Sequence, residues 1–378
     1  NYFDSDIFRE SIKYVTDNLD VNTEYNNIPL KEEKLAEGFD KNNINYRVIP
    51  KNNSSDHGME CGFCAFGCGY GSRNSSYKVW LNNEDFNGNI YSDTSIKRMI
   101  LNNNEATHIE VENNGVISIV EVEKVILAGG SLNTPSILLN SGYKNPQLGK
   151  NLKTHPVSGV AGRFKEEQKP WFGSMQGMHS EDFLFKTDNY GYLLQGLPMH
   201  PSIFFPYFPN FVSSAADFIE SYNNWSGAIV LTSDTSSGSL INNGPLWKYT
   251  LNDFDSNHLL DGLTKLVKSY YLAGAEEIMV SASPTMYWKR NESQDIEEFI
   301  NQILSIKNQP YRLLLGSAHQ MGTARMNPNP NLGVTDLNGK VHGLDNVYIV
   351  DSSIFPRCSG VNPMVTIQST SHFLMSQL

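Results

Sequence analysis

Cysteines are scarce in this sequence and long apolar runs are missing, and each shortage excludes a class of protein. Only four of the 378 residues are cysteine, and Cys61, Cys64 and Cys68 fall within one short stretch. That is a local cluster and not the framework of a disulfide-stapled scaffold. No apolar run reaches the ~18 residues that a membrane-spanning helix needs, so we expect no integral membrane protein. The opening residues do not predict a secretory signal peptide.

Basic charge is also in short supply. The chain carries 29 Lys and Arg residues against 40 Asp and Glu residues, a formal net charge of −11. Such an acidic chain repels the phosphate backbone of nucleic acids, so we expect no nucleic-acid partner. Apolar residues still make up 39% of the sequence, against 18% charged residues, which excludes a disordered acidic tail. The length predicts two or three domains, and no internal repeat divides the chain.

Three stretches carry chemistry, and the first is a glycine pair between an expected strand and an expected helix. Lys124–Gly130 reads Lys-Val-Ile-Leu-Ala-Gly-Gly, which indicates a buried parallel strand running into a tight turn. We expect a helix with Thr134 as N-cap and Pro135 in its first position, ending at Ser141 and Gly142. Two glycines there let the backbone approach a nucleotide closely. Taken alone, the pattern favours an ordinary turn.

The second stretch places a histidine among small residues. His319 lies in Gly316–Thr323, which reads Gly-Ser-Ala-His-Gln-Met-Gly-Thr, in an expected loop after an apolar strand. As a catalyst, His319 would serve as a general base near neutral pH. Taken alone, the pattern favours a structural histidine.

The third stretch holds an aspartate and an asparagine. Asp351 follows an expected buried strand at Val347–Val350, a position where a carboxylate can bind a sugar hydroxyl. Asn362 precedes Pro363 and an expected helix over 364–374, so its amide either points into a cleft or caps that helix. Taken alone, the pattern favours a cap.

The middle of the chain differs in character and predicts a second domain. It is rich in Phe, Tyr, Trp, Met and Pro. Strands of an antiparallel sheet are expected at Ala228–Thr232 and Gly238–Ile241. A long amphipathic helix is expected from Asp255 or Ser256 to Ala273, and another over 295–307.

Taken together and in this order, these stretches resemble the glucose–methanol–choline (GMC) family of flavin oxidoreductases. Ala128–Pro135, with its trailing Leu-Leu-Asn-Ser-Gly, is similar to the family's second signature. Leu148–Pro156 resembles the following element, which usually ends in Asp-His-Pro, with Thr154 in place of the Asp. His319 and Asn362 fall where the family carries its active-site His–Asn pair.

Two further segments extend the resemblance to a subgroup. The residues from Val350 to Ile367 are similar to the family's flavin-contacting strand and helix near the C-terminus. Cys61–Cys68 with Gly71, and Ser317–Gly322, resemble the long-chain fatty alcohol oxidases. That subgroup oxidises long primary alcohols to aldehydes with FAD and O₂.

The resemblance implies a mechanism and a set of site residues. His319 would take or orient the hydroxyl proton while hydride passes from the alcohol carbon to flavin N5, and Asn362 would bind the same oxygen. O₂ or another acceptor would reoxidise the flavin. Asp351 would contact the ribityl or phosphate region of FAD, the backbone at Asn362 and Pro363 the ring, and Ala128 and Gly129 the adenosine part. The implied cofactor-binding residues are Ala128, Gly129, Asn133, Asp351, Ser352, Asn362, Pro363 and Met364.

The implied fold is α/β, or α+β for the chain as a whole. An incomplete Rossmann-like FAD-binding domain over 1–157 would resume over 309–378 with the catalytic residues. A substrate domain built on an antiparallel sheet would be inserted over 158–308. Aromatic residues in it would line a channel for an alkyl chain, although ordinary core packing explains each of them as well. They are Trp171, Phe172, Phe204, Phe205, Tyr207 and Phe208.

The sequence departs from the family at one important point. No Gly-x-Gly-x-x-Gly loop for the FAD pyrophosphate is found, since Gly67–Gly71 has the wrong spacing and follows no buried strand. We therefore expect a partial protein whose sheet lacks its central strand and leaves its edges exposed. The alternative to an enzyme is an inactive remnant without bound FAD.

The cysteine cluster leaves another alternative open. Cys61, Cys64 and Cys68 have the spacing of part of a zinc or iron–sulfur site, with His57 or Cys358 as a fourth ligand. A non-catalytic metal-binding protein would follow. No second Cys-x-x-Cys is present, so we favour reduced structural thiols and expect no metal.

The location in the cell is open. An intracellular location is favoured, and the final residues Ser376-Gln377-Leu378 weakly resemble a peroxisomal signal. Resemblance to the subgroup also suggests peripheral membrane association.

Overall fold

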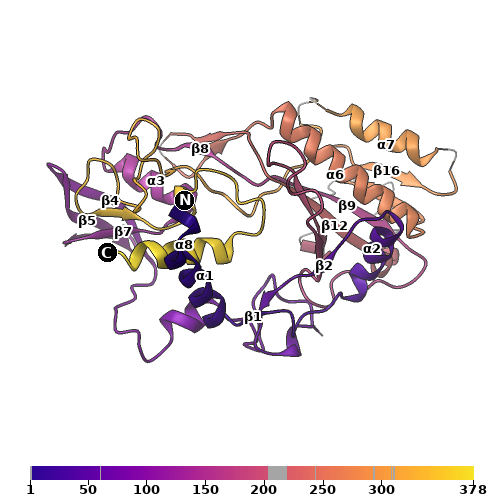
Figure 1. The fold of residues 1–378 in the computed structure, drawn as a ribbon, viewed down its shortest axis with the longest axis horizontal. Coiled ribbons are helices and arrows are strands. Elements are labelled where there is room, and N and C mark those ends of the chain that lie inside the picture. The colour runs from indigo at the N-terminus through magenta and orange to yellow at the C-terminus, as the bar shows by residue number, and fades with distance from the viewer. Residues whose placement is uncertain are drawn as a thin grey trace.

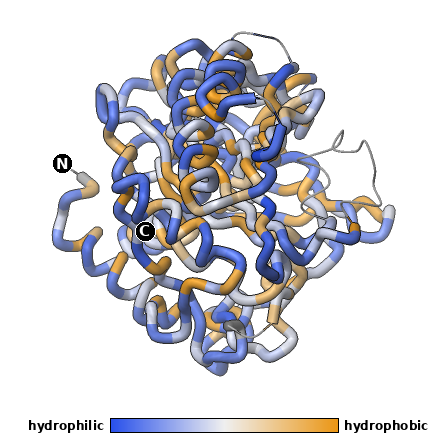
Figure 2. Tube along the Cα trace, turned by 90° about the vertical axis from the view of Figure 1, so that its right-hand side faces the viewer, coloured by the Kyte–Doolittle hydropathy of each residue, from blue (hydrophilic) through white to orange (hydrophobic). Residues whose placement is uncertain are grey.

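The computed structural model describes residues 2–59, 61–202, 219–242, 244–292, 294–307, 309 and 311–378. Two lobes lie side by side along the long axis of the molecule, and both termini lie in the same lobe (Figure 1). Hydrophilic segments dominate the outer turns, and apolar segments run through the interior (Figure 2). Among the described helices, none is long and apolar enough to span a bilayer.

The helices and strands have the following bounds. The helices are α1 Asp6–Asn18, α2 Leu30–Lys41, α3 Gly130–Asn140, α6 Asp253–Leu272, α7 Ile296–Ser305 and α8 Met364–Met375, with short helices η1 Tyr2–Asp4, η2 Asp56–Met59, η3 Tyr77–Leu81, η4 Tyr222–Asn224 and η5 Ser352–Ile354. The strands are β1 Val21–Asn22, β2 Arg47–Val48, β3 Lys51–Asn52, β4 Thr94–Asn102, β5 Glu105–Asn113, β6 Val116–Glu121, β7 Val125–Leu127, β8 Lys150–Leu152, β9 Val157–Arg163, β10 Met178–Ser180, β11 Tyr192–Leu197, β12 Trp225–Thr232, β13 Gly238–Leu240, β14 Trp247–Lys248, β15 Glu277–Val280, β16 Met286–Lys289 and β17 Val347–Ile349.

The lobe that contains both termini is built on small sheets. β7 pairs in parallel with β17 in a two-stranded sheet, and β4, β5 and β6 form an antiparallel sheet of three strands. α1 packs on α8, where Phe8 meets Phe373 edge to face with ring centroids 5.4 Å apart. The expected parallel strand is thus confirmed at β7. Among the described strands β7 pairs only with β17, while the other edge of β17 is bridged by the segment 339–341 through hydrogen bonds at 2.9 and 2.8 Å.

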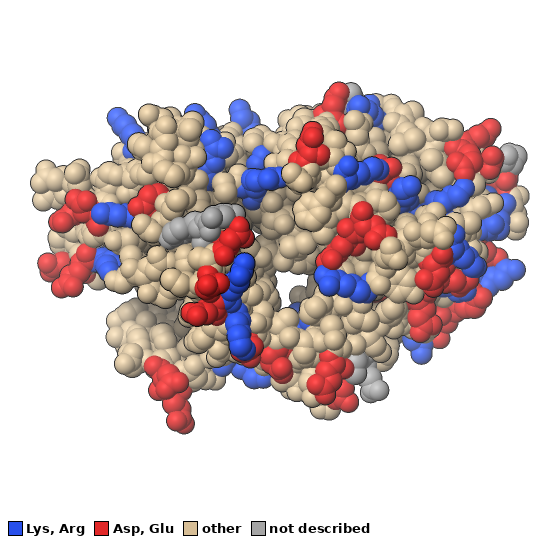
Figure 3. Space-filling view, viewed as in Figure 1, with Lys and Arg blue, Asp and Glu red and all other residues tan. Residues whose placement is uncertain are grey.

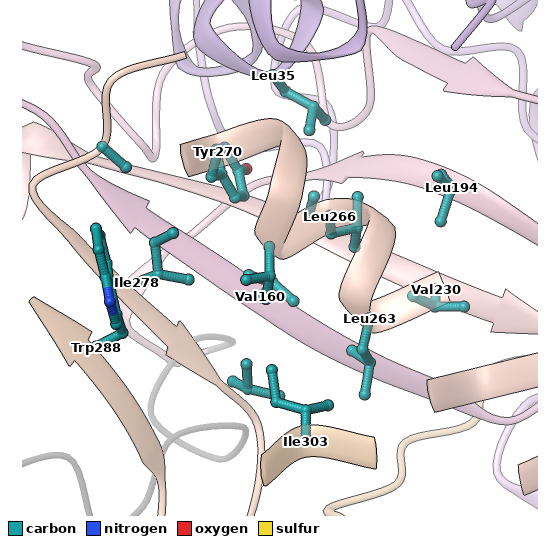
Figure 4. Close-up of a cluster of buried hydrophobic side chains, with 14 of the residues drawn as sticks. Leu35, Val160, Leu194, Val230, Leu263, Leu266, Tyr270, Ile278, Trp288 and Ile303 are labelled. Carbon is teal, nitrogen blue, oxygen red and sulfur yellow. The ribbon is translucent and has the colours of Figure 1, made fainter. Parts of the chain in front are cut away.

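The other lobe is built on a seven-stranded sheet of order β16-β15-β9-β12-β11-β10-β2, whose named pairs are all antiparallel. α6 packs on β9, β11 and β12, and α2 packs beside it on β12. Leu263, Leu266 and Tyr270 of α6 are fully buried there (Figure 4). Each large apolar side chain buried in this way contributes ~1.5–3 kcal/mol. Packing of α6 and α2 on the sheet therefore stabilises this lobe.

Fold class is confirmed: an α/β lobe carries a second region built on an antiparallel sheet. The expected strands at 228–232 and 238–241 are present as β12 and β13, but β13 belongs to a separate sheet with β8 and β14. The division at 157 and 308 stays a prediction. α2 and β2 precede residue 157, yet they pack in the core and sheet of the middle region.

Helix α6 begins earlier than expected. The side chain of Asn252 caps it by accepting a hydrogen bond from the N–H of Asp255 at 2.8 Å. The Asp255 carboxylate accepts instead from the backbone N–H groups of Thr235 and Ser236. Asp255 therefore lies inside the helix and does not cap it.

Candidate active site

The turn after β7 is held by an aspartate that follows β17. Because β7 and β17 run parallel, their carboxyl ends meet, and this places Asp351 against the glycine pair. Its buried carboxylate accepts from the N–H of Gly130 at 2.9 Å, from the hydroxyl of Thr134 at 2.5 Å and from the N–H of Ser353 at 2.8 Å. In this structure the Asp351 carboxylate is therefore bound by the protein's own groups, and its predicted contact with FAD stays a prediction.

Helix α3 begins at Gly130, not after Thr134, which corrects the expected N-cap. Thr134 is unable to cap because its hydroxyl donates to Asp351 and accepts from the N–H of Gly129 at 3.0 Å. Pro135 consequently lies inside the helix, where its missing N–H would leave the carbonyl of Ser131 without a partner. The buried hydroxyl of Thr323 donates to that carbonyl at 2.6 Å, which explains how the proline is tolerated.

The loop that carries His319 is tied to this turn by serines. The hydroxyls of Ser131 and Ser352 both donate to the carbonyl of Gln320, at 3.0 and 2.9 Å. Gly322, with φ at +91°, donates its N–H to the carbonyl of Ser352. A Cβ on Gly322 would lie 2.6 Å from the carbonyl oxygen of Asn151, so only glycine fits there.

His319 contacts a second histidine. Its Nδ1 lies 2.9 Å from Nδ1 of His155, a fully buried residue. Burial lowers the pKa of His319 to about 4, and burial together with the neighbouring His319 lowers the pKa of His155 to about 3. Both rings are therefore neutral near pH 7, and a single proton lies between the two Nδ1 atoms.

A buried aspartate holds His155 in place. The N–H groups of Thr154 and His155 donate to the Asp234 carboxylate at 3.0 and 3.2 Å, and the hydroxyl of Tyr249 donates to it at 2.9 Å. Burial raises the pKa of Asp234. His155 has φ at +48°, which is uncommon for a residue other than glycine. Three hydrogen bonds to one carboxylate hold this conformation.

A cavity of about 270 Å³ lies beside His319 and the glycine turn. Of the predicted site residues, it is lined by Gly129, Asn133, His319, Ser352 and Pro363. Gly130 also lines it, has φ at +75° and would meet no atom within 4 Å with an added Cβ. The backbone at this turn is therefore open to a ligand.

The cavity does not include all of the predicted residues. Ala128, Asp351, Asn362 and Met364 are not among its lining residues. Asn362 is exposed, and the predicted contact of His319 and Asn362 with one substrate oxygen stays a prediction. Asn362 does not cap α8, because Pro363 occupies the N-cap position.

Sequence reasoning missed His155 and Asp234 as parts of the site. His155 was present in the motif Thr154-His155-Pro156, but no role was assigned to it. Asp234 follows strand β12 and no local pattern marks it. Only the fold brings these residues to His319.

The aromatic channel is only partly described. Phe204, Phe205, Tyr207 and Phe208 lie outside the described residues. Trp171 and Phe172 do not line the cavity beside His319. They pack by the cysteine segment, where a Cβ on Gly62 would lie 2.0 Å from the carbonyl oxygen of Trp171.

The cysteines form no metal site among the described residues. All four are free thiols, and no group of three or more potential ligands converges there. Reduced structural thiols without a metal stay a prediction for this cluster. Burial raises the pKa of Cys68, but hydrogen bonds from the N–H groups of Arg73, Ser72 and Tyr70 outweigh it and hold the pKa below its usual value.

The surface carries mixed charge on the face shown in Figure 3. Acidic and basic side chains are interspersed there, and no large basic patch gathers on that face.

Comparison with known proteins assigns the chain to one family. Models of the GMC oxidoreductase family match residues 1–157 and 227–371. This chain belongs to the GMC oxidoreductase family.

Its relatives include two long-chain-alcohol oxidases of Arabidopsis thaliana. One is 31% identical over 98% of this chain and 53% of its own length, and the other is 27% identical over 100% and 53%. The chain thus spans about half the length of the curated relatives it matches. This similarity does not assign a role to any individual residue of this chain.

Solved structures support the fold alone. Pyridoxine 4-oxidase from Mesorbium loti matches with a TM-score of 0.65 and 16% identity over 92% of this chain and 69% of that one. Formate oxidase from Aspergillus oryzae RIB40 matches with a TM-score of 0.64 and 16% identity over 92% and 70%.

Proposed function

We propose that this chain carries the site for FAD-dependent oxidation of a primary alcohol to an aldehyde, with His319 as the base. The observation that supports this most directly is the position of His319. It lines a cavity beside an open glycine turn, and its Nδ1 is engaged by His155, so Nε2 is the ring nitrogen left for a substrate. Membership of the GMC family supports the reaction class.

The residues around the cavity fit part of a flavin nucleotide. Gly130 leaves room over the turn, and Gly129, Asn133, Ser352 and Pro363 would hold the group. Ligand pockets usually enclose ~300–1,000 Å³, so a cavity of about 270 Å³ suits one end of FAD and not the whole molecule. When bound, the flavin supplies the acceptor for hydride at its N5.

The protein's own contribution is orientation and proton transfer. His319 is neutral at pH 7, because burial holds its pKa at about 4, so its Nε2 is free to accept the hydroxyl proton. A base with so low a pKa takes up a proton only while negative charge develops beside it.

We propose a long-chain fatty alcohol as the substrate and O₂ or another acceptor as the oxidant. The support is the similarity to the two Arabidopsis long-chain-alcohol oxidases. An acidic chain with its charges interspersed on the face of Figure 3 is consistent with an uncharged substrate.

The test is an absorption spectrum of the purified chain after incubation with FAD and removal of the excess. We expect bound-flavin bands that a long-chain primary alcohol bleaches under anaerobic conditions. A fatty acid of equal length is the matched control and should leave the bands unchanged. Bound flavin that the alcohol does not bleach would refute the reaction, and no bound flavin would refute the proposal that this chain carries the site on its own.

A further inference from the structure

The contact between His155 and His319 has the geometry of a hydrogen bond that carries one proton. The two Nδ1 atoms lie 2.9 Å apart, and the ring centroids are 5.0 Å apart with planes inclined by 32°. Two lone pairs cannot face each other at this distance, and neither can two N–H groups. One Nδ1 therefore donates and the other accepts.

The segments that carry the two rings are fastened together. Backbone hydrogen bonds join Lys153 to Met321 in both directions, at 2.8 and 3.0 Å, and Val157 to Gly316 in both directions, at 2.9 and 2.8 Å. The hydroxyl of Ser317 donates to the carbonyl of Thr154. Asp234 then fixes the backbone of His155 from the other side. The ring of His155 is thus held against His319 by the fold.

The position of the proton decides what His319 can do. If His155 donates, Nε2 of His319 carries a hydrogen and cannot accept another. If His319 donates, its Nε2 presents a lone pair to the cavity. Nε2 of His155 is buried without a hydrogen-bond partner, and it is left unpaired whether it carries a hydrogen or a lone pair. The unpaired atom does not select between the arrangements.

We propose that His155 is a positioning residue whose Nδ1 accepts the Nδ1 proton of His319 and thereby holds His319 in the tautomer with a basic Nε2. This inference rests on the proposed function, because only that tautomer lets His319 accept a hydroxyl proton. In the step, the O–H bond of the alcohol breaks and an N–H bond forms at Nε2 of His319. The proton at Nδ1 stays on His319, and its hydrogen bond to His155 becomes charge-assisted.

His155 is a neutral acceptor for this hydrogen bond. Burial keeps the pKa of His155 at about 3, so His155 remains a neutral acceptor while His319 is protonated. The other titratable groups at this segment gather around Asp234, which binds the backbone of His155, and they are Tyr249, Lys153 and Cys358. None of these groups bonds to the imidazole of His155 in this structure.

Nitrogen-15 NMR of the histidine side chains tests the proposal without flavin or alcohol. The full chain is labelled at its nine histidines, and the signals of His155 and His319 are assigned by substitution. We expect His319 with its hydrogen on Nδ1 and His155 with its hydrogen on Nε2 at pH 7. The opposite pair of tautomers, or two rings that each exchange freely between tautomers, would overturn the proposal.

Two variants sharpen the test. His155→Asn keeps an acceptor oxygen near the place of Nδ1 and tolerates the positive φ, so His319 should keep its hydrogen on Nδ1. His155→Phe removes the acceptor, and a substantial fraction of His319 should then carry its hydrogen on Nε2. An unchanged His319 tautomer in the Phe variant would count against the proposal. If that variant fails to fold, the wild-type and Asn spectra still decide.

A matched control is His258→Gln. His258 is also buried and has an unpaired Nδ1, but it lies on α6 and faces no second imidazole in a hydrogen bond. The tautomer of His319 should not respond to it. If the predicted tautomers are found but alcohol does not bleach the bound flavin, the proposed function is refuted while the histidine pairing stands. Failure of the proposed function can therefore be told apart from failure of this inference.

Discussion

Replacing Thr323 by valine should loosen the first turns of α3. The hydroxyl of Thr323 donates to the carbonyl of Ser131, and Pro135 cannot supply the N–H that would otherwise reach that carbonyl. A buried carbonyl without a partner costs ~1–3 kcal/mol. Valine keeps the shape of threonine, so the change removes the hydrogen bond and little else.

The cause can be isolated by a double-mutant cycle with Pro135→Ala. Alanine at 135 restores an N–H that can reach the carbonyl of Ser131, so Thr323→Val should then cost less than ~1 kcal/mol. Alanine also leaves a small void in place of proline, but both proteins with alanine at 135 contain this void, so its cost cancels in the cycle. We expect a coupling of ~1–2 kcal/mol between the two sites.

Hydrogen exchange of the α3 amides measures the cost directly. Thr323→Val should speed exchange by ~5- to 150-fold in the native background and by much less in the alanine background. Thr335→Val is the matched control, because the buried hydroxyl of Thr335 has no hydrogen-bond partner. Equal acceleration by Thr323→Val in both backgrounds would show that the proline does not set the need for this hydroxyl.

Further predictions concern the base, the response to pH and the exposed sheet. His319→Ala should slow alcohol-dependent flavin reduction by ~10²-fold or more in stopped-flow traces while flavin content stays the same, and unchanged kinetics would rule out the base. Burial holds the pKa of His155 at about 3 and that of His319 at about 4, so the unfolded chain takes up these two protons at a higher pH than the folded chain does. The free energy of unfolding should therefore fall as pH falls from ~6.5 toward 4, by up to ~1.4 kcal/mol per pH unit for each ring. Urea unfolding should therefore show a shallower acid loss in His155→Asn, and parallel curves would contradict this. Ile119 on β6 is 52% exposed, so Ile119→Lys should reduce self-association in sedimentation velocity, and an unchanged distribution would argue against this face.

The sequence predicts those parts of the fold that depend on local pattern. The sequence predicts β7 and α8 because an apolar run and a proline before a helix are local signals. The predicted start of α3 is wrong because the hydroxyl of Thr134 binds Asp351, a residue 217 positions away. Composition gives no sign of such a partner.

The candidate site shows the same limit. Motif resemblance led to His319, Gly129, Ser352 and Pro363, which share one cavity. It also led to Asn362, which is exposed and is not among the residues that line this cavity. His155 went unassigned because its importance comes from a ring 164 positions away that only the folded chain brings within 2.9 Å.

The pairing of β7 with β17 sets the order in which the chain can fold. The N–H of Gly130 donates to the carboxylate of Asp351, which is 221 positions further along the chain. Among the described strands, β7 pairs only with β17, which is also made late. Contacts this distant in sequence form slowly, since a long loop must close before they contribute. During synthesis, the pairing of β7 with β17 and the hydrogen bond from Gly130 to Asp351 therefore form only after residue 351 has been added. Expression should respond to chaperone supply and to low temperature more strongly than the size of the chain alone would suggest.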